Sequence, residues 1–186
     1  GDNLTVSDEN IGGQTDNAIS VATLFQLMED GFEGTMIFTA EEECGKSGEY
    51  IADYFYKQNL YPQDLIVVDI TPYYDTTAVD RGLVVLRNCD ARGDFNAELV
   101  NVVKKTCFDI KLAFEMKDEH ILKVGVPDPY RNIGFTELGQ IIKYTDGKMN
   151  GASVQIPTVH KKMHDEMTNF KSLHNYYYIL KKITDK

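Results

Sequence analysis

Three consecutive glutamates follow a short run of residues that favours a β-strand, and this segment has the side chains most suited to chemistry. The run is Thr35–Thr39, and Glu41, Glu42 and Glu43 come directly before a turn at Gly45. Carboxylates packed together at the carboxyl end of a strand repel one another unless a cation lies among them. A divalent metal ion would supply that charge, and a solvated acidic loop is the alternative.

Further metal-ligand residue types lie at the ends of other predicted elements. Asp16 stands where a helix begins, a position that an ordinary N-cap aspartate also favours. Asp69 interrupts an apolar run near its end, and a buried aspartate needs a cation or hydrogen-bond donors. His160 and His164 follow the last predicted strand, with a surface loop as the alternative for both. Oxygen and imidazole donors suit a catalytic divalent metal site, and a shared aspartate can bridge two ions.

Alternating strand and helix patterns would bring these residues to one edge of a sheet. The first predicted helix, Asp16–Met28, has an apolar face formed by Ala18, Val21, Ala22, Phe25 and Met28 and widened by Leu24 and Leu27, so we expect it to be largely buried. The remaining predicted elements are a strand at Thr35–Thr39, a helix at Gly48–Asn59, strands at Asp64–Ile70 and Leu83–Leu86, a helix at Asn96–Glu115, a strand at Ile121–Val126, a helix at Thr136–Tyr144, a strand at Ala152–Ile156 stopped by Pro157, and a helix at Ser172–Ile183. This alternation predicts an α/β fold, a three-layer sandwich with a mostly parallel, mixed central sheet flanked by helices.

Composition narrows the classes of partner. The 186 residues are enough for one hydrophobic core, and the net charge of −10 argues against a nucleic-acid partner. The sequence has no apolar run of membrane-spanning length and no signal peptide. Cys44, Cys89 and Cys107 are odd in number and irregularly spaced, which favours reduced thiols in a cytoplasmic protein.

Taken together, the motifs resemble those of the co-catalytic zinc exopeptidases, most closely the glutamyl-aminopeptidase and peptidase T-like branches. The matching segments follow the family's order over nearly the whole chain. They are Thr15–Ala18 for the helix-opening Asp-Asn motif, Phe38–Gly45 for the Phe-Thr and Glu-Glu motif, Val68–Pro72 for the Asp-Val-Thr motif, Gly134–Glu137 for a Gly-Thr-Asp turn and Met163–Thr168 for the closing histidine motif.

The resemblance implies a role for each matched residue. Alignment on Gly45 makes Glu42 the general base and Glu43 a metal ligand. Asp16 would bridge two metals, Asp69 would bind the first and His164 the second. Because the closing motif is spaced unusually, His160 stays an alternative ligand. The implied cofactor is zinc, as one or two divalent ions, with cobalt or manganese as substitutes. The resemblance also implies a cis peptide bond between Asp16 and Asn17.

The function expected from this resemblance is that of a zinc-dependent exopeptidase, with an aminopeptidase as the first expectation. A carboxypeptidase or an amide deacylase on the same scaffold is one alternative, and a non-catalytic domain that keeps the fold for binding or assembly is another. The substrate would be a peptide or an N-acyl amino acid, with no nucleic-acid or membrane partner, and a homo-oligomer stays open.

The start of the chain departs from the family pattern. The family has a His-x-Asp motif ahead of the bridging aspartate, whereas no histidine precedes Asp16 and the chain begins at Gly1. We therefore expect residues 1–186 to be a single catalytic-type domain that is truncated at its N-terminus and has little activity as given.

Overall fold

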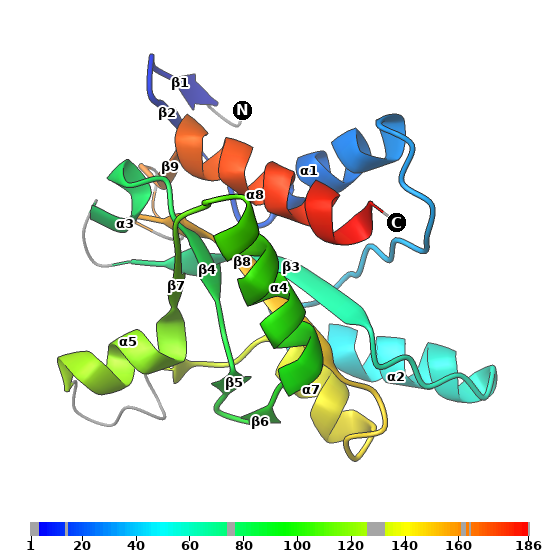
Figure 1. Cartoon of the computed structure of the whole chain (residues 1–186). Helices are drawn as coiled ribbons and strands as arrows, with labels where there is room; N and C mark the ends of the chain where they lie inside the picture. The colour runs from blue at the N-terminus through cyan, green and yellow to red at the C-terminus, as the bar shows by residue number, and fades with distance from the viewer. Residues whose placement is uncertain are drawn as a thin grey trace.

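Helices and strands alternate along the computed structural model (Figure 1). The structure describes residues 4–13, 15–73, 77–125, 133–160, 163 and 165–185. Its helices are α1 (Ala18–Glu29), α2 (Ser47–Lys57), α3 (Thr77–Asp80), α4 (Ala97–Asp109), α5 (Lys117–Val124), α7 (Glu137–Tyr144) and α8 (Phe170–Thr184). Its strands are β1 (Thr5–Val6), β2 (Asn10–Gly12), β3 (Leu65–Pro72), β4 (Val84–Leu86), β5 (Cys89–Asp90), β6 (Gly93–Asp94), β7 (Phe114–Met116), β8 (Gly151–Thr158) and β9 (Met167–Asn169).

The central sheet has four strands in the order β3-β8-β4-β7. β3 and β8 run parallel over their whole length, with Leu65 beside Gly151 at one end and Pro72 beside Thr158 at the other. β4 is antiparallel to β8 and parallel to β7, so the sheet is mixed, as predicted. A second sheet, β1-β2-β9, is antiparallel and joins the start of the chain to the segment that follows β8.

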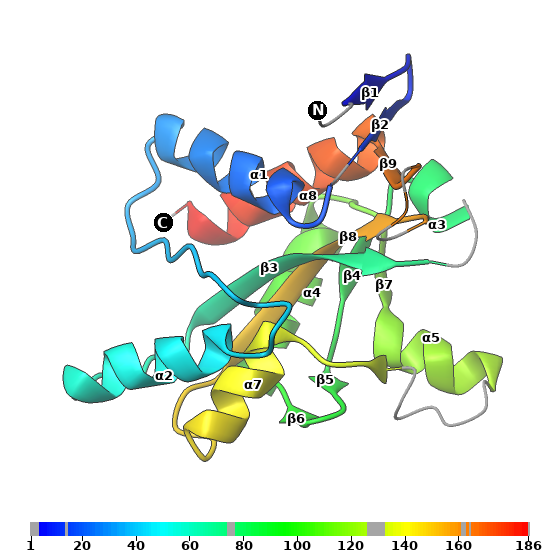
Figure 2. The ribbon, with the colours of Figure 1, turned by 180° about the vertical axis from the view of Figure 1, so that it is seen from behind.

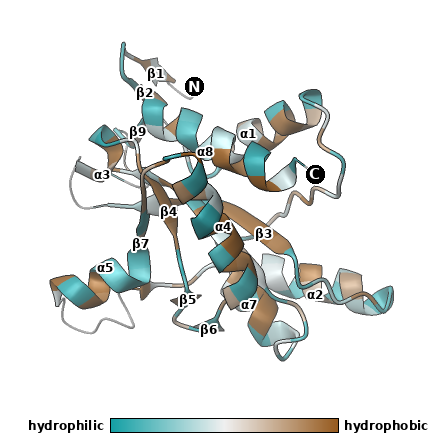
Figure 3. Cartoon of the chain, viewed as in Figure 1, coloured by the Kyte–Doolittle hydropathy of each residue, from teal (hydrophilic) through white to brown (hydrophobic). Residues whose placement is uncertain are grey.

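Helices cover both faces of the central sheet, which confirms the predicted α/β sandwich. α4 and α8 lie in front of the sheet in Figure 1, and α7 lies in front of it in the reverse view of Figure 2. Successive strand residues point to opposite faces, and the two hydrophobic clusters follow this alternation. One cluster joins Val154 and Ile156 to α4 and α8, and the other joins Leu65 to α2 and α7. Figure 3 shows the hydrophobic residues concentrated on β3, β4 and β8.

The predicted strand at Thr35–Thr39 is wrong. Residues 35–39 pair with no strand in the described part of the chain. The side chains of Ile37 and Phe38 are exposed, and the Phe38 ring stacks on Phe25 of α1 with centroids 5.3 Å apart. Strand propensity reflects packing on a pleated, half-buried surface, and this segment has no such surface around it.

Two predictions between residues 96 and 126 are also wrong. The helix predicted for Asn96–Glu115 runs from Ala97 to Asp109, and Phe114–Met116 is a strand that pairs with β4. The predicted strand at Ile121–Val126 is instead helical up to Val124, where Gly125 ends the helix with a left-handed φ of 70°. Asn96 is the N-cap of this helix, with its side chain accepting from the Glu98 and Leu99 amides.

The predicted stop at Pro157 is wrong as well, because β8 continues to Thr158. Proline cannot donate to a strand ladder. Here β4 pairs with β8 only at Val154 and Gln155, so the ladder on that side has already ended when β8 reaches Pro157.

Helix α1 buries only one side of the predicted face, the side that carries Leu27. Val21, Phe25 and Met28 are exposed, and the residues that pack inward are Ile19, Ser20, Thr23 and Leu27. Ser20 Oγ lies 2.8 Å from the hydroxyl of Tyr176 in α8, and both residues are buried. A helix that is apolar on every side gives no periodic signal for the face that packs inward.

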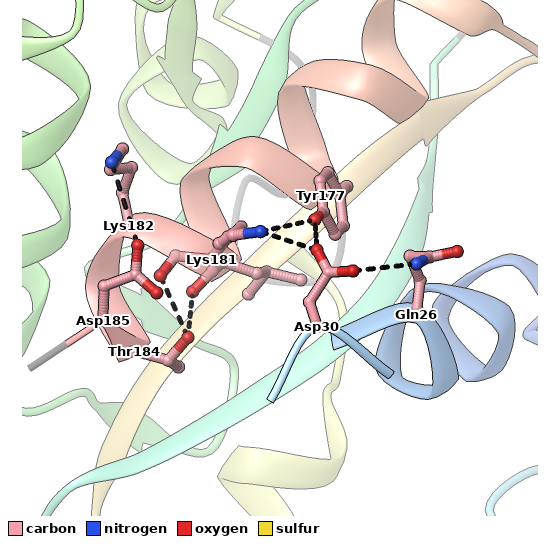
Figure 4. A network of polar contacts seen from close by, with 8 residues as sticks. Gln26, Asp30, Tyr177, Lys181, Lys182, Thr184 and Asp185 are labelled. Atoms are coloured by element: carbon pink, nitrogen blue, oxygen red, sulfur yellow. Dashed lines mark hydrogen bonds and ion pairs between the residues drawn. The ribbon is translucent and has the colours of Figure 1, made fainter. Parts of the chain in front are cut away.

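The end of α1 is tied to α8 by a polar network (Figure 4). Asp30 accepts hydrogen bonds from Lys181 Nζ at 2.6 Å, from the Tyr177 hydroxyl and from Gln26 Nε2 at 3.0 Å. These bonds, led by that from Lys181, lower the pKa of Asp30 to about 2. This network therefore holds the C-terminal end of α1 against α8.

Candidate functional site

Each neighbour of Asp16 is bound to a segment that carries another candidate ligand. The side chain of Asn17 donates to the carbonyl of Val68 at 3.2 Å, and Val68 precedes Asp69. On the other side, the hydroxyl of Thr15 donates to Glu166 Oε1, and Glu166 lies two residues after His164 in the sequence. Asp16 therefore lies between the middle of β3 and the segment that precedes β9.

Asp16 is not the N-cap of α1. The helix begins at Ala18, and the cap position is occupied by Asn17, whose side chain makes no capping hydrogen bond and binds β3 instead. The peptide bond between Asp16 and Asn17 is cis, which confirms the expectation drawn from the family resemblance. Asp16 is half-buried.

The acidic loop forms a tight turn that leads into α2. The amides of Cys44 and Lys46 both donate to the carbonyl of Glu41 at 3.2 Å, and the Gly45 amide donates to the carbonyl of Glu42 at 2.7 Å. Gly45 has a φ of 70°, which a side chain would disfavour. Two residues later, Ser47 begins α2.

The three glutamates of this loop have different surroundings. The carboxylate of Glu41 binds Lys46 Nζ at 3.2 Å and accepts from the Tyr50 hydroxyl at 3.1 Å, so α2 holds it. This hydrogen bond from Tyr50 to Glu41 raises the pKa of Tyr50. Glu42 and Glu43 are exposed.

Helix α7 packs against the acidic loop and the first turn of α2. A side chain at Gly48 in α2 would overlap Gln140 of α7, and the Gln140 amide lies beside Gly45. The start of α7 is fixed by Asp90, which accepts from the Thr136 amide at 2.8 Å, the Thr136 hydroxyl at 2.8 Å and the Arg92 amide at 2.7 Å. Asp90 is buried, since only 5% of this residue is exposed.

Asp69 lies on the face of the sheet that carries the buried polar residues. It is half-buried, its neighbour in β8 is Gln155, and its Oδ1 accepts from the Ile70 amide at 2.7 Å. Arg87 donates to Gln155 Oε1 at 2.7 Å and to the carbonyl of Ile133. Burial lowers the pKa of Arg87, and the nearby charges of Asp90, Asp69 and Asp118 oppose that shift.

Sequence reasoning missed this buried charge altogether. Arg87 and Lys117 are 4% and 9% exposed, and both donate to the Thr71 hydroxyl near the end of β3. Asp118 accepts from the backbone and side-chain amides of Asn88, each at 2.9 Å. The partners lie far apart in the sequence, so no local pattern marked these residues.

The histidine end of the site is described only in part. His164 lies outside the described residues. His160, the alternative ligand, lies with its Nδ1 2.6 Å from the carboxylate of Asp165, and its side chain is about half exposed. Within the described ranges, no group of three or more His, Cys, Asp or Glu side chains is arranged to hold a metal ion.

The chain is similar in structure to solved peptidases. It matches no protein-family model and no curated protein. The whole chain superimposes on 53% of the TET1 peptidase of Pyrococcus horikoshii with a TM-score of 0.74 and 16% identity. It also superimposes on 52% of an aminopeptidase from the archaeon Desulfurococcus kamchatkensis with a TM-score of 0.74 and 14% identity. In addition, 99% of it covers 52% of a Thermotoga maritima protein described as an endoglucanase, with a TM-score of 0.64 and 12% identity.

At these identities the likeness is one of fold. The chain has the α/β scaffold found in solved aminopeptidases and spans about half the length of the structures it matches. None of the helices that the structure describes is both long and apolar enough to cross a membrane. In the described residues, Asp16 lies between segments bound to Val68 and to Glu166, and the buried cations Arg87 and Lys117 both donate to Thr71.

Proposed function

We propose that this chain forms the metal-binding catalytic part of an exopeptidase, and that the enzyme is an aminopeptidase. The observation that carries the proposal is the double attachment of Asp16, through Asn17 to the residue before Asp69 and through Thr15 to Glu166. A bridging ligand needs this arrangement, because it must face ligands from two separate segments. The aminopeptidase fold of the structural neighbours supports the same reading.

The donor set fits a zinc-like ion. Asp16, Asp69 and Glu43 offer carboxylate oxygens and His164 an imidazole, which are the donors that catalytic zinc sites combine. An ion held by these residues would polarise the peptide carbonyl and lower the pKa of the attacking water. The chain's own acids then have to move the proton.

Glu42 is the residue proposed for that proton transfer. It would take the proton from the attacking water and pass it to the leaving amine, which is general base and then general acid catalysis. Lys46 and Tyr50 hold the Glu41 carboxylate against α2. The register set by Gly45 makes Glu42 and Glu43 the pair proposed to act at the site.

The proposed substrate is a peptide with a free amino terminus, and the proposed compartment is the cytoplasm. Cys44, Cys89 and Cys107 are free thiols, which is the usual state in a reducing compartment. Assembly into a homo-oligomer is proposed by analogy with the TET1 peptidase, which is described as forming a tetrahedron or an octahedral shell.

Single substitutions along the acidic loop test this proposal. In an active form of the enzyme, Glu42→Gln is expected to abolish hydrolysis of aminoacyl-nitroanilides and leave the zinc content near normal. Glu43→Gln is expected to reduce the zinc retained after dialysis. Glu41→Gln is the matched control and should change neither quantity, because Glu41 is held by α2. Elemental analysis gives the zinc content, and the hydrolysis assay is repeated with zinc, cobalt and manganese.

Two results would contradict the proposal. If the unsubstituted chain retains no zinc, and added zinc does not raise its melting temperature, then the chain has no functional metal site. If Glu41→Gln abolishes hydrolysis and Glu42→Gln loses zinc, then the register is shifted by one residue. Hydrolysis of N-acyl amino acids in place of aminoacyl-nitroanilides would identify a deacylase instead.

A further inference from the structure

Glu166 is a buried carboxylate that the proposed chemistry does not use. Only 1% of it is exposed, and it is among the largest fully buried side chains. A carboxylate is rarely buried so completely, because leaving water is costly unless hydrogen bonds replace it. The burial of Glu166 therefore needs a structural reason, whereas an exposed glutamate in a surface loop would need none.

The backbone and the side chain of Glu166 both hold the segment that leads into Asp16. The Glu166 carbonyl accepts from the Gly13 amide at 2.9 Å, and its Oε1 accepts from the Thr15 hydroxyl. Thr15 is itself buried, with 3% exposed. Gly12 also packs closely against Glu166, since a Cβ added at Gly12 would lie 3.0 Å from the Glu166 carbonyl oxygen.

The same residue anchors the end of the loop that follows β8. The Glu166 amide donates to the carbonyl of Met163 at 3.2 Å, and the next residue, Met167, exchanges two backbone hydrogen bonds with Val159. Met167 also pairs with Gly12 across the β2–β9 ladder. Glu166 thus lies where the loop returns to the sheet, with the start of the chain on its other side.

We infer that Glu166 and Thr15 form a positioning pair, which fixes the candidate bridging aspartate Asp16 relative to the residues directly before β9. This inference rests on the proposed function, since it supposes that Asp16 binds a metal. A hydrogen bond one residue from a ligand acts on the metal by restricting the ligand's backbone. Partners outside the ligand shell typically change metal affinity by about 10–100-fold when they are removed.

The test compares zinc affinity and stability in matched threonine variants. Thr15→Val removes the hydroxyl at nearly constant volume and is expected to raise the zinc dissociation constant about tenfold. Thr15→Ser keeps the hydroxyl and should stay within about threefold of the unsubstituted chain, in keeping with a retained hydrogen bond. Zinc affinity is measured by chelator competition at neutral pH, and the melting temperature of each variant is measured without metal.

Thr145→Val is the control for a purely structural effect. The hydroxyl of Thr145 is also buried and donates to the carbonyl of Ile141 at 2.7 Å, at the far end of α7. This variant should lower the melting temperature and leave the zinc affinity unchanged. If Thr15→Val behaves in the same way, or if Thr15→Ser loses as much affinity as Thr15→Val, the positioning role is overturned.

Glu166→Gln gives an independent check, because it keeps an acceptor oxygen for Thr15 and removes the negative charge. It is expected to hold zinc within about threefold of the unsubstituted chain, since the hydrogen bond is retained. A tenfold loss would mean that the charge at residue 166 matters and the hydrogen bond does not, which overturns the inference. If the unsubstituted chain itself binds no zinc, it is the proposed function that fails.

Discussion

Replacing Gly139 by alanine tests how α7 is fixed behind the acidic loop. Gly139 lies in the first turn of that helix, and alanine is favoured over glycine in a helix by about 1 kcal/mol. Helix propensity alone therefore predicts a more stable protein. In this structure, however, a Cβ at residue 139 would overlap the carboxylate of Asp90.

The size of the effect follows from what Asp90 would have to give up. Its carboxylate is 5% exposed and accepts hydrogen bonds from the Thr136 amide, the Thr136 hydroxyl and the Arg92 amide. A hydrogen bond to a charged group contributes about 1.5–3 kcal/mol. Losing two of them, less about 1 kcal/mol gained from propensity, leaves a net destabilisation of about 2–5 kcal/mol.

Urea unfolding measures this change, with Gly93→Ala as the control. A Cβ at Gly93 would lie 3.7 Å from Ile142 Cγ2, which is an ordinary contact, so that variant should stay within about 0.5 kcal/mol. The decisive comparison is a double-mutant cycle. In an Asp90→Ala background, Gly139→Ala is expected to be neutral or stabilising. Equal destabilisation in both backgrounds would refute the role assigned to Asp90.

Three further predictions concern the rest of the molecule. The pKa of Asp30 is lowered to about 2 in the folded state, so the ionised carboxylate stabilises the fold. Asp30→Asn should therefore be most destabilising above about pH 5, and its effect on the free energy of unfolding should disappear as the pH falls towards 2. Unfolding experiments across this pH range measure the difference. Phe25→Ala should cost less than about 1 kcal/mol and reduce binding of a hydrophobic dye, since Phe25 is 53% exposed, whereas Phe95→Ala, at 4% exposed, should cost about 3–5 kcal/mol. Cys44 is exposed and should react with a thiol reagent in the folded protein, whereas burial raises the pKa of Cys107 to about 12, so Cys107 should react only on unfolding.

The central strands could be predicted because their signal is local. The apolar run in β3 marks a strand that is buried on both faces, and Ala152–Ile156 reads the same way in β8. The cap at Asn96 is equally local, since its side chain binds amides two and three residues away. These features depend on neighbours in sequence, so one sequence is enough to find them.

The errors come from residues whose environment is set by distant parts of the chain. Thr35–Thr39 has the composition of a strand, but composition does not say whether a partner strand lies beside it. Helix α1 is apolar on several sides, so its periodicity did not distinguish the face that meets Tyr176 from the exposed face of Phe25. The burial of Asp90 has no local sequence signal, because its partner, Thr136, lies 46 residues away.

In the candidate site too, the residue types could be predicted from the sequence, whereas their placement depends on distant parts of the chain. Carboxylates and histidines at element ends select the candidates, but what would make Asp16 a bridging ligand is its position between two other segments. That position depends on the contact of Asn17 to Val68, 51 residues away, and on the contact of Thr15 to Glu166, 151 residues away. The register of β2 against β9, with Gly12 beside Met167, brings the second contact together. A one-residue slip in that ladder would turn alternate side chains to the other face and would separate Thr15 from Glu166. The pairing of two short strands with no strong sequence signal therefore decides whether the acids named by the sequence can act together.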